Sequence, residues 1–73
     1  MRRAIYTGTG RKLATMDVRV GNAAFGETRE DRDAELSRIA DMVRRKLAEG
    51  ETEGTCLDWN GNTVGTWRKA GAR

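Results

Sequence analysis

The chain has 73 residues, a formal net charge of +3, no His, no Pro and a single Cys. That length accommodates one small domain, and its few large apolar side chains predict a fold that is marginally stable alone and would gain stability from a dimer or a bound partner. One Cys can form neither an intramolecular disulfide nor a structural zinc site. Because the chain also lacks His, the usual general base for a Ser or Cys nucleophile, we expect no enzymatic activity, no metal and no cofactor.

Hydropathy and charge indicate where the protein works. No apolar run approaches the ~18–20 residues of a membrane span, and the start of the chain lacks the apolar core of a signal peptide. We therefore expect a cytoplasmic protein that does not contact a membrane. Residues 1–20 contain five basic residues and one acidic residue, so the positive charge is concentrated in the N-terminal segment.

The N-terminal segment predicts a β-hairpin. A first strand over about 3–7 ends at Gly8-Thr9-Gly10, whose backbone permits a chain reversal. A second strand over about 12–20 alternates apolar and polar residues, which places its apolar residues on one face. These apolar residues are Ala14, Met16, Val18 and Val20.

A long amphipathic helix is predicted over about 29–49. Thr28 is a suitable N-cap residue, and Gly50 is placed to end the helix. Apolar residues at helical spacing form a stripe about 100° wide that should face a core. The stripe consists of Leu36, Ile39, Ala40, Val43 and Leu47.

The C-terminal segment predicts a second hairpin, with strands over about 54–59 and 62–68. Asn60-Gly61 between them favours a two-residue type I′ turn. In that register Leu57, Val64 and Trp59 form the more apolar face, which should receive the helix. Trp67 would then lie on the opposite, solvent-exposed face.

Together these elements predict a single α+β domain with ββαββ order. The simplest arrangement is a four-stranded antiparallel sheet covered on one face by the amphipathic helix, followed by a basic tail over 69–73. The pattern leaves the order of the strands in the sheet open.

Two motifs fail on spacing. Thr7 to Lys12 has one residue between its glycines where a Walker loop needs four, and Leu13 follows the Lys. Asp58, Asn60 and Asn62 alternate like calcium ligands, but Gly61 stands at the fourth loop position instead of the sixth. Neither a phosphate loop nor a calcium loop is predicted.

Two groups of residues are candidates for contact with a partner. Trp and Arg are enriched at binding hot spots, and the exposed position expected for Trp67 makes it the centre of the first group. The second is a positive patch at the N-terminal hairpin, where the turn should bring the basic side chains together. The candidate residues are Trp67, Arg68, Lys69, Arg2, Arg3, Arg11 and Lys12.

In its short length, hairpin-helix-hairpin layout and lack of a catalytic motif, the chain resembles small phage-encoded inhibitors such as anti-CRISPR proteins. The resemblance covers the whole chain but rests on no diagnostic residue, so it transfers no functional position. It implies a non-enzymatic protein, encoded by a phage or mobile element, that binds a host protein or ribonucleoprotein CRISPR-Cas complex stoichiometrically in the host cytoplasm.

Three alternatives stay open. The basic hairpin and the C-terminal tail could form a nucleic-acid-binding module, since aromatic and cationic residues are paired there as in single-strand binders. Two strands before a helix are also found in HicB-like antitoxins. A homodimer is compatible with the nucleic-acid-binding module, with the antitoxin and with the inhibitor.

Overall fold

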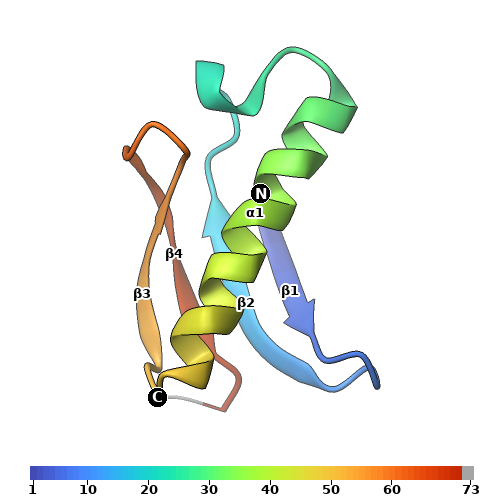
Figure 1. The fold of residues 1–73 in the computed structure, drawn as a ribbon, viewed down its shortest axis with the longest axis vertical. Coiled ribbons are helices and arrows are strands. Elements are labelled where there is room, and N and C mark those ends of the chain that lie inside the picture. The colour runs from blue at the N-terminus through green and yellow to red at the C-terminus, as the bar shows by residue number, and fades with distance from the viewer. Residues whose placement is uncertain (72–73) are drawn as a thin grey trace.

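A computed structural model describes residues 1–71 of the chain. In Figure 1 the long helix lies across one face of the sheet. The sheet has four antiparallel strands, so the α+β fold with ββαββ order is present as predicted. The strand order is β1-β2-β4-β3, which places the two hairpins side by side with β2 next to β4. The elements are β1 (Arg2–Tyr6), β2 (Lys12–Val18), the short 3-10 helix η1 (Ala23–Phe25), α1 (Arg29–Ala48), β3 (Glu53–Leu57) and β4 (Thr63–Lys69). Of the predicted basic tail over 69–73, Ala72 and Arg73 lie outside the described residues.

The bounds of α1 follow from its caps. The Thr28 hydroxyl accepts a hydrogen bond from the Asp31 N–H at 3.1 Å, which fixes the first turn. At the other end Gly50 adopts a φ of +92°, and the N–H groups of Gly50 and Glu51 donate to the carbonyls of Leu47 and Lys46. This Schellman motif ends the helix one residue before the predicted position. No helix within residues 1–71 has both the length and the apolarity needed to cross a membrane.

The core lies between α1 and one face of the sheet. As predicted, Leu36, Ile39 and Val43 of α1 are fully buried, whereas Leu47 packs against the core but stays partly exposed. Phe25 of η1 adds a buried side chain that no periodic pattern in the sequence predicts. The sheet contributes Ile5, Ala14, Met16, Val18, Cys56, Val64 and Trp67.

The turn between β3 and β4 is not the predicted two-residue type I′ turn. The Asp58 N–H donates to the Asn62 carbonyl and the Gly61 N–H donates to the Asp58 carbonyl, each at 2.9 Å, and Gly61 alone in the turn has a positive φ. These contacts define a three-residue loop that ends in a left-handed glycine. Leu57 therefore pairs with Thr63, and a bulge at Val64 restores the predicted pairing of Thr55 with Thr66.

The prediction of which face of β3 and β4 the helix covers is confirmed for Val64, which is buried, but is wrong for Leu57 and for both Trp residues. Met16, which faces the core, pairs with Trp67, and Trp67 pairs with Gly54. Residues paired across strands share a face, so the apolar row of β2 brings Trp67 under α1. Trp67 is consequently 3% exposed, whereas Trp59 at the loop is 65% exposed.

Two glycines make this packing sterically feasible. A Cβ at Gly54 would lie 2.9 Å from Nε1 of Trp67, so the indole occupies the space that a side chain would need. A Cβ at Gly65 would overlap the backbone carbonyl of Asp17 on β2. The close approach of β4 to β2 and the burial of Trp67 therefore both depend on glycine.

Candidate partner-binding surface

The structure does not gather the four basic residues of the N-terminal hairpin into one patch. Arg2 and Arg3 are consecutive strand residues and point to opposite faces of the sheet, where their guanidinium groups lie 3.8 Å from Asp17 and 3.7 Å from Asp33 respectively. Arg11 and Lys12 lie at the other end of the hairpin, since Lys12 pairs with Tyr6 at the end of β1. The prediction of a single patch is wrong because it neglected strand alternation and strand length.

The group centred on Trp67 is also divided by the sheet. The Trp67 side chain is buried, so it cannot be the predicted exposed anchor of a partner-binding surface. Arg68 points to the opposite face and lies 3.5 Å from Glu53 of the neighbouring strand. Lys69 is exposed at the end of β4. The three residues are consecutive in sequence but do not form one continuous surface.

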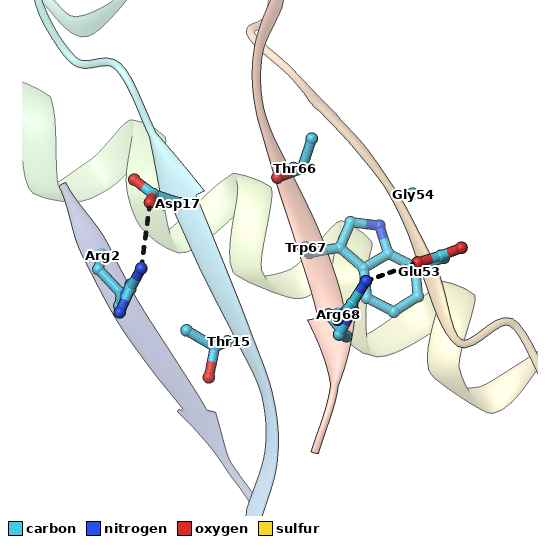
Figure 2. A pocket seen from close by; sticks show the side chains of 8 residues that line it. All are labelled: Arg2, Thr15, Asp17, Glu53, Gly54, Thr66, Trp67 and Arg68. Carbon is cyan, nitrogen blue, oxygen red and sulfur yellow. Dashed lines mark hydrogen bonds and ion pairs between the residues drawn. The ribbon is translucent and has the colours of Figure 1, made fainter. Parts of the chain in front are cut away.

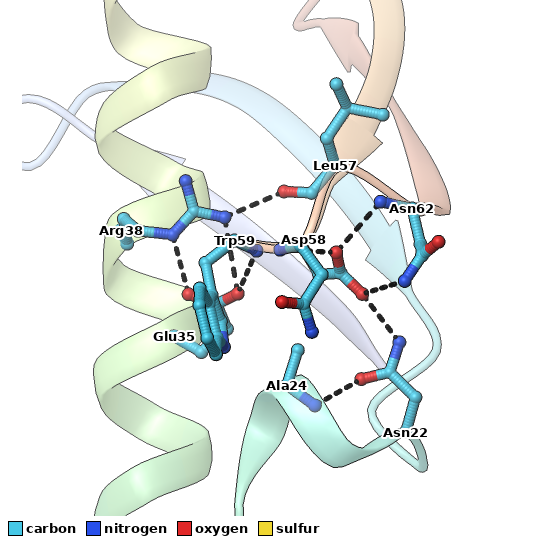
Figure 3. A network of polar contacts seen from close by, with 9 residues as sticks. Asn22, Ala24, Glu35, Arg38, Leu57, Asp58, Trp59 and Asn62 are labelled. Carbon is cyan, nitrogen blue, oxygen red and sulfur yellow. Dashed lines mark hydrogen bonds and ion pairs between the residues drawn. The ribbon is translucent and has the colours of Figure 1, made fainter.

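Trp59 is the large aromatic side chain that the structure exposes most. It lies in the loop between β3 and β4, beside Leu57, which is also partly exposed, and Arg38 of α1 (Figure 3). The Arg38 guanidinium donates to the Leu57 carbonyl at 2.9 Å, which joins the helix to the hairpin. We call Trp59, Leu57 and Arg38 the Trp59 surface.

A buried carboxylate holds the loop from within. The Asp58 carboxylate accepts hydrogen bonds from the backbone N–H groups of Asn60 and Asn62, each at 2.9 Å, as in an Asx turn. Its other oxygen accepts from the Asn22 side chain at 2.8 Å, which ties the loop to the segment before η1. Burial alone would raise the pKa of Asp58, but the hydrogen bonds from Asn62, Asn22 and Asn60 outweigh it, so the pKa is lowered.

A second buried carboxylate connects the loop to α1. Glu35, which is 6% exposed, accepts a hydrogen bond at 2.8 Å from the backbone N–H of Trp59. The Arg38 guanidinium donates to both of its oxygens, at 2.6 and 3.2 Å. These contacts raise the pKa of Arg38 through the hydrogen bond with Glu35, against the opposing effect of burial. Glu35 is thus fully paired, as a buried charge must be to be tolerated.

Together Asp58 and Glu35 fix the backbone on both sides of the Trp59 side chain. The residues that hold the loop come from η1's N-cap, α1 and the loop itself, so three segments must be folded for Trp59 to take this position (Figure 3). The Trp59 surface is therefore a preorganised feature of the tertiary structure.

The uncovered face of the sheet carries polar side chains. A hollow of about 620 Å³ lies there, bordered by Arg2, Asp17, Arg68 and Glu53. Thr15 and Thr66 lie between these side chains (Figure 2). Two ion pairs lie along the border of the hollow and both are long, at 3.8 Å between Arg2 and Asp17 and 3.5 Å between Arg68 and Glu53. All four side chains are largely exposed. Such pairs contribute little to stability and leave both Arg side chains available to a ligand.

The chemistry available within residues 1–71 is limited. No three Cys, Asp or Glu side chains in this range are grouped so that they could hold a metal ion. Cys56 is buried in the core, and desolvation raises the pKa of its thiol to about 11, which keeps it protonated and unreactive at neutral pH.

Comparisons with protein-family models, with curated proteins and with solved structures find no match. The geometry of the site is therefore the basis for its function.

Part of this site can be predicted from the sequence. The turn signal at Asn60-Gly61 and the run of Asp58, Asn60 and Asn62 predict a tight turn directly after Trp59. Glu35 carried no comparable signal, because its partner in the loop, the Trp59 N–H, lies 24 residues away in sequence.

Proposed function

We propose that this protein is a non-enzymatic binding protein that docks the Trp59 surface onto another macromolecule. In its most specific form it is a phage or mobile-element inhibitor that binds a host CRISPR-Cas complex stoichiometrically. The observation that supports the proposal is an exposed Trp on a loop backbone that two buried, hydrogen-bonded carboxylates hold in place.

An exposed Trp on an ordered loop favours binding to a partner. An indole that stays in solvent adds nothing to the free energy of folding. Inserting the same indole into a pocket of a partner buries a large apolar area, which favours binding. Because the loop is already ordered, little conformational entropy is lost on binding. Arg38 adds a partly exposed guanidinium beside the indole, and Trp with Arg is the combination most enriched at hot spots.

Transformation of bacteria with a CRISPR-targeted plasmid tests the proposal directly. Strains with different active CRISPR-Cas systems would express the wild-type protein, Trp59→Ala or Tyr6→Ala. Tyr6 is the matched control, since it is an exposed aromatic residue on the other hairpin. We expect the wild type and Tyr6→Ala to restore transformation of at least one strain by at least tenfold, and Trp59→Ala to lose this effect. Equal activity of Trp59→Ala and the wild type would contradict the role of the Trp59 surface.

The second candidate function is nucleic-acid binding on the uncovered sheet face. It is favoured by Arg2 and Arg68, which border the hollow and are held only by long ion pairs. Fluorescence anisotropy with labelled short DNA and RNA at 50 and 200 mM salt distinguishes the two functions, because phosphate contacts weaken steeply with salt. Tight, salt-sensitive binding that Arg2→Ala and Arg68→Ala abolish would favour this candidate over the first.

A further inference from the structure

We propose that two copies of this chain pair through the outer edge of β3, forming a homodimer with a continuous eight-stranded sheet. This interaction goes beyond the proposed function, since it uses the backbone edge of β3 and not the Trp59 side chain, although Leu57 and Arg38 of the Trp59 surface lie beside that edge. β3 is one of the two outermost strands of the sheet, so one side of its backbone has no strand partner.

The hydrogen-bond pattern shows which backbone groups of β3 face outward. The Thr52 carbonyl accepts from the Lys69 N–H of β4 at 2.7 Å, and the Asp58 N–H donates to the Asn62 carbonyl. In an antiparallel pair such inward-facing residues alternate with outward-facing ones. Gly54 and Cys56 therefore face β4, whereas the N–H and C=O groups of Glu53, Thr55 and Leu57 point away from the sheet.

The two edges of the sheet differ in protection. Edge strands commonly avoid pairing through charged side chains, especially Lys, or through Pro, and β1 begins with Arg2-Arg3. β3 has the sequence Glu-Gly-Thr-Cys-Leu, in which only the first residue, Glu53, is charged. Its midpoint, Thr55, is a small β-branched residue that pairs well across strands. The β3 edge is thus the one suited to pairing.

A groove runs beside this edge, between β3 and α1. It has a volume of about 290 Å³ and is lined by Met42 and Lys46 of α1 and by Thr55 and Leu57 of β3, with Gly54 and Trp67 at its base. The Nε1 of Trp67 lies next to Gly54. The groove therefore offers apolar contact beside the free strand edge.

A second copy fits this edge because the edge is self-complementary. A two-fold axis at Thr55 sets all five residues of β3 against those of the copy, with Leu57 opposite Glu53. Arg38 lies at the Leu57 end of the edge, and the acidic Glu51 lies at the other end. The antiparallel arrangement brings each Arg38 toward the copy's Glu51 and sets the two Met42 side chains near the axis.

Light scattering of the full-length protein over a range of concentrations tests the proposal, together with two variants. Thr55→Lys would place two like charges directly opposite each other on the axis. Thr66→Lys is the matched control, because Thr66 is exposed and is the cross-strand partner of Thr55, but it lies on the inner strand β4. We expect the wild type and Thr66→Lys to have twice the monomer mass of 8.1 kDa, and Thr55→Lys to have the monomer mass.

Disulfide formation provides a second readout, because a covalent bond between opposed residues also traps a weakly associated dimer. Directly opposed residues of a hydrogen-bonded pair have Cα atoms about 5.5 Å apart, within the range that a disulfide can span. Under mild oxidation Thr55→Cys should form a covalent dimer, while Thr66→Cys and the wild type, whose Cys56 is buried, should not. A monomeric wild type at all concentrations, or equal masses of Thr55→Lys and the wild type, would overturn the proposal. Binding of an extended peptide by a monomer would also overturn it.

Discussion

The two hairpins have similar lengths but are held in different ways. In the N-terminal hairpin the turn after β1 is organised by its own residues, with the Thr7 hydroxyl accepting from the N–H groups of Thr9 and Arg11 at 3.3 and 3.0 Å. In the C-terminal hairpin the loop is tied to α1 through Glu35 and to the segment before η1 through Asp58 and Asn22. Tertiary contacts therefore fix the position of Trp59, while the turn at residues 7–11 has only local support.

This difference indicates which hairpin can present a binding residue. The N-terminal turn carries Arg11, and within residues 1–71 the hydrogen bonds to the backbone of this turn come from Thr7 and Arg11 of the turn itself. The C-terminal loop carries an exposed indole on a backbone that buried charges hold in place. A preorganised side chain loses less entropy on binding, so the second hairpin is the better candidate surface.

The largest contrast between the hairpins should come from their aromatic residues. Trp67→Ala removes a buried indole that joins β4 to α1, and we expect a loss of about 3–5 kcal/mol, enough to unfold so small a domain. Tyr6→Ala on β1 removes a side chain that is 51% exposed and should cost less than about 1 kcal/mol. Urea denaturation followed by circular dichroism measures both. A folded Trp67→Ala protein with an unchanged midpoint would contradict the packing described above.

A pair of glycines gives the next contrast. Gly65→Ala would push a methyl group into the Asp17 carbonyl, which forces β4 away from β2 and should cost about 3 kcal/mol. Gly8→Ala in the N-terminal turn meets no atom within 4 Å and should change stability by less than about 0.5 kcal/mol. Thermal melts of the two variants give the comparison. Equal melting temperatures would show that β2 and β4 do not approach as closely as described.

Removing a carboxylate from the C-terminal network should have a smaller effect. Glu35→Ala leaves the Trp59 N–H and the Arg38 guanidinium without their acceptor, and we expect a loss of about 1–3 kcal/mol. Asp41→Ala is the control, because Asp41 also pairs with an Arg three residues away but is exposed, and it should cost less than about 0.5 kcal/mol. Denaturation midpoints separate the two, and a similar effect of both variants would remove the distinction between buried and surface pairs.

The smallest expected effect is the pH dependence due to Asp58. Its pKa is lower in the folded protein than the ordinary value of about 3.9, so the unfolded chain binds more protons as the pH falls through this range. The contribution of Asp58 to stability is therefore complete above about pH 5 and is lost as the pH falls through the folded pKa. Melting temperatures between pH 2 and 6 should show a shallower acid loss for Asp58→Asn than for the wild type, and parallel curves would exclude this role.

Local patterns were sufficient to predict most of the fold. The capping residue Thr28, the apolar stripe from Leu36 to Val43 and the glycine after the helix depend on neighbouring residues only, and the structure confirms them. The face of β4 could not be predicted in the same way. It depends on β2 pairing with β4, a contact between segments about 50 residues apart that the chain order does not reveal.

The binding surface was harder to predict than the fold. Both Trp residues were recognised, but their roles were exchanged because the turn length and the covered face were each assigned from one hairpin alone. The contact of Glu35 with the Trp59 backbone arises from tertiary packing, because a residue on α1 must meet a loop 24 positions later in the chain. The bulge at Val64 accompanies the three-residue loop, which the turn signal at Asn60-Gly61 did not predict.

Backbone ¹⁵N NMR relaxation tests the central claim most directly, because it compares the two hairpin tips in one protein. We predict that the amide of Trp59 has an order parameter close to the ~0.85 of rigid backbone, while that of Thr9 in the N-terminal turn is lower. An order parameter for Trp59 as low as that of Thr9 would contradict the claim that buried carboxylates hold Trp59 in place.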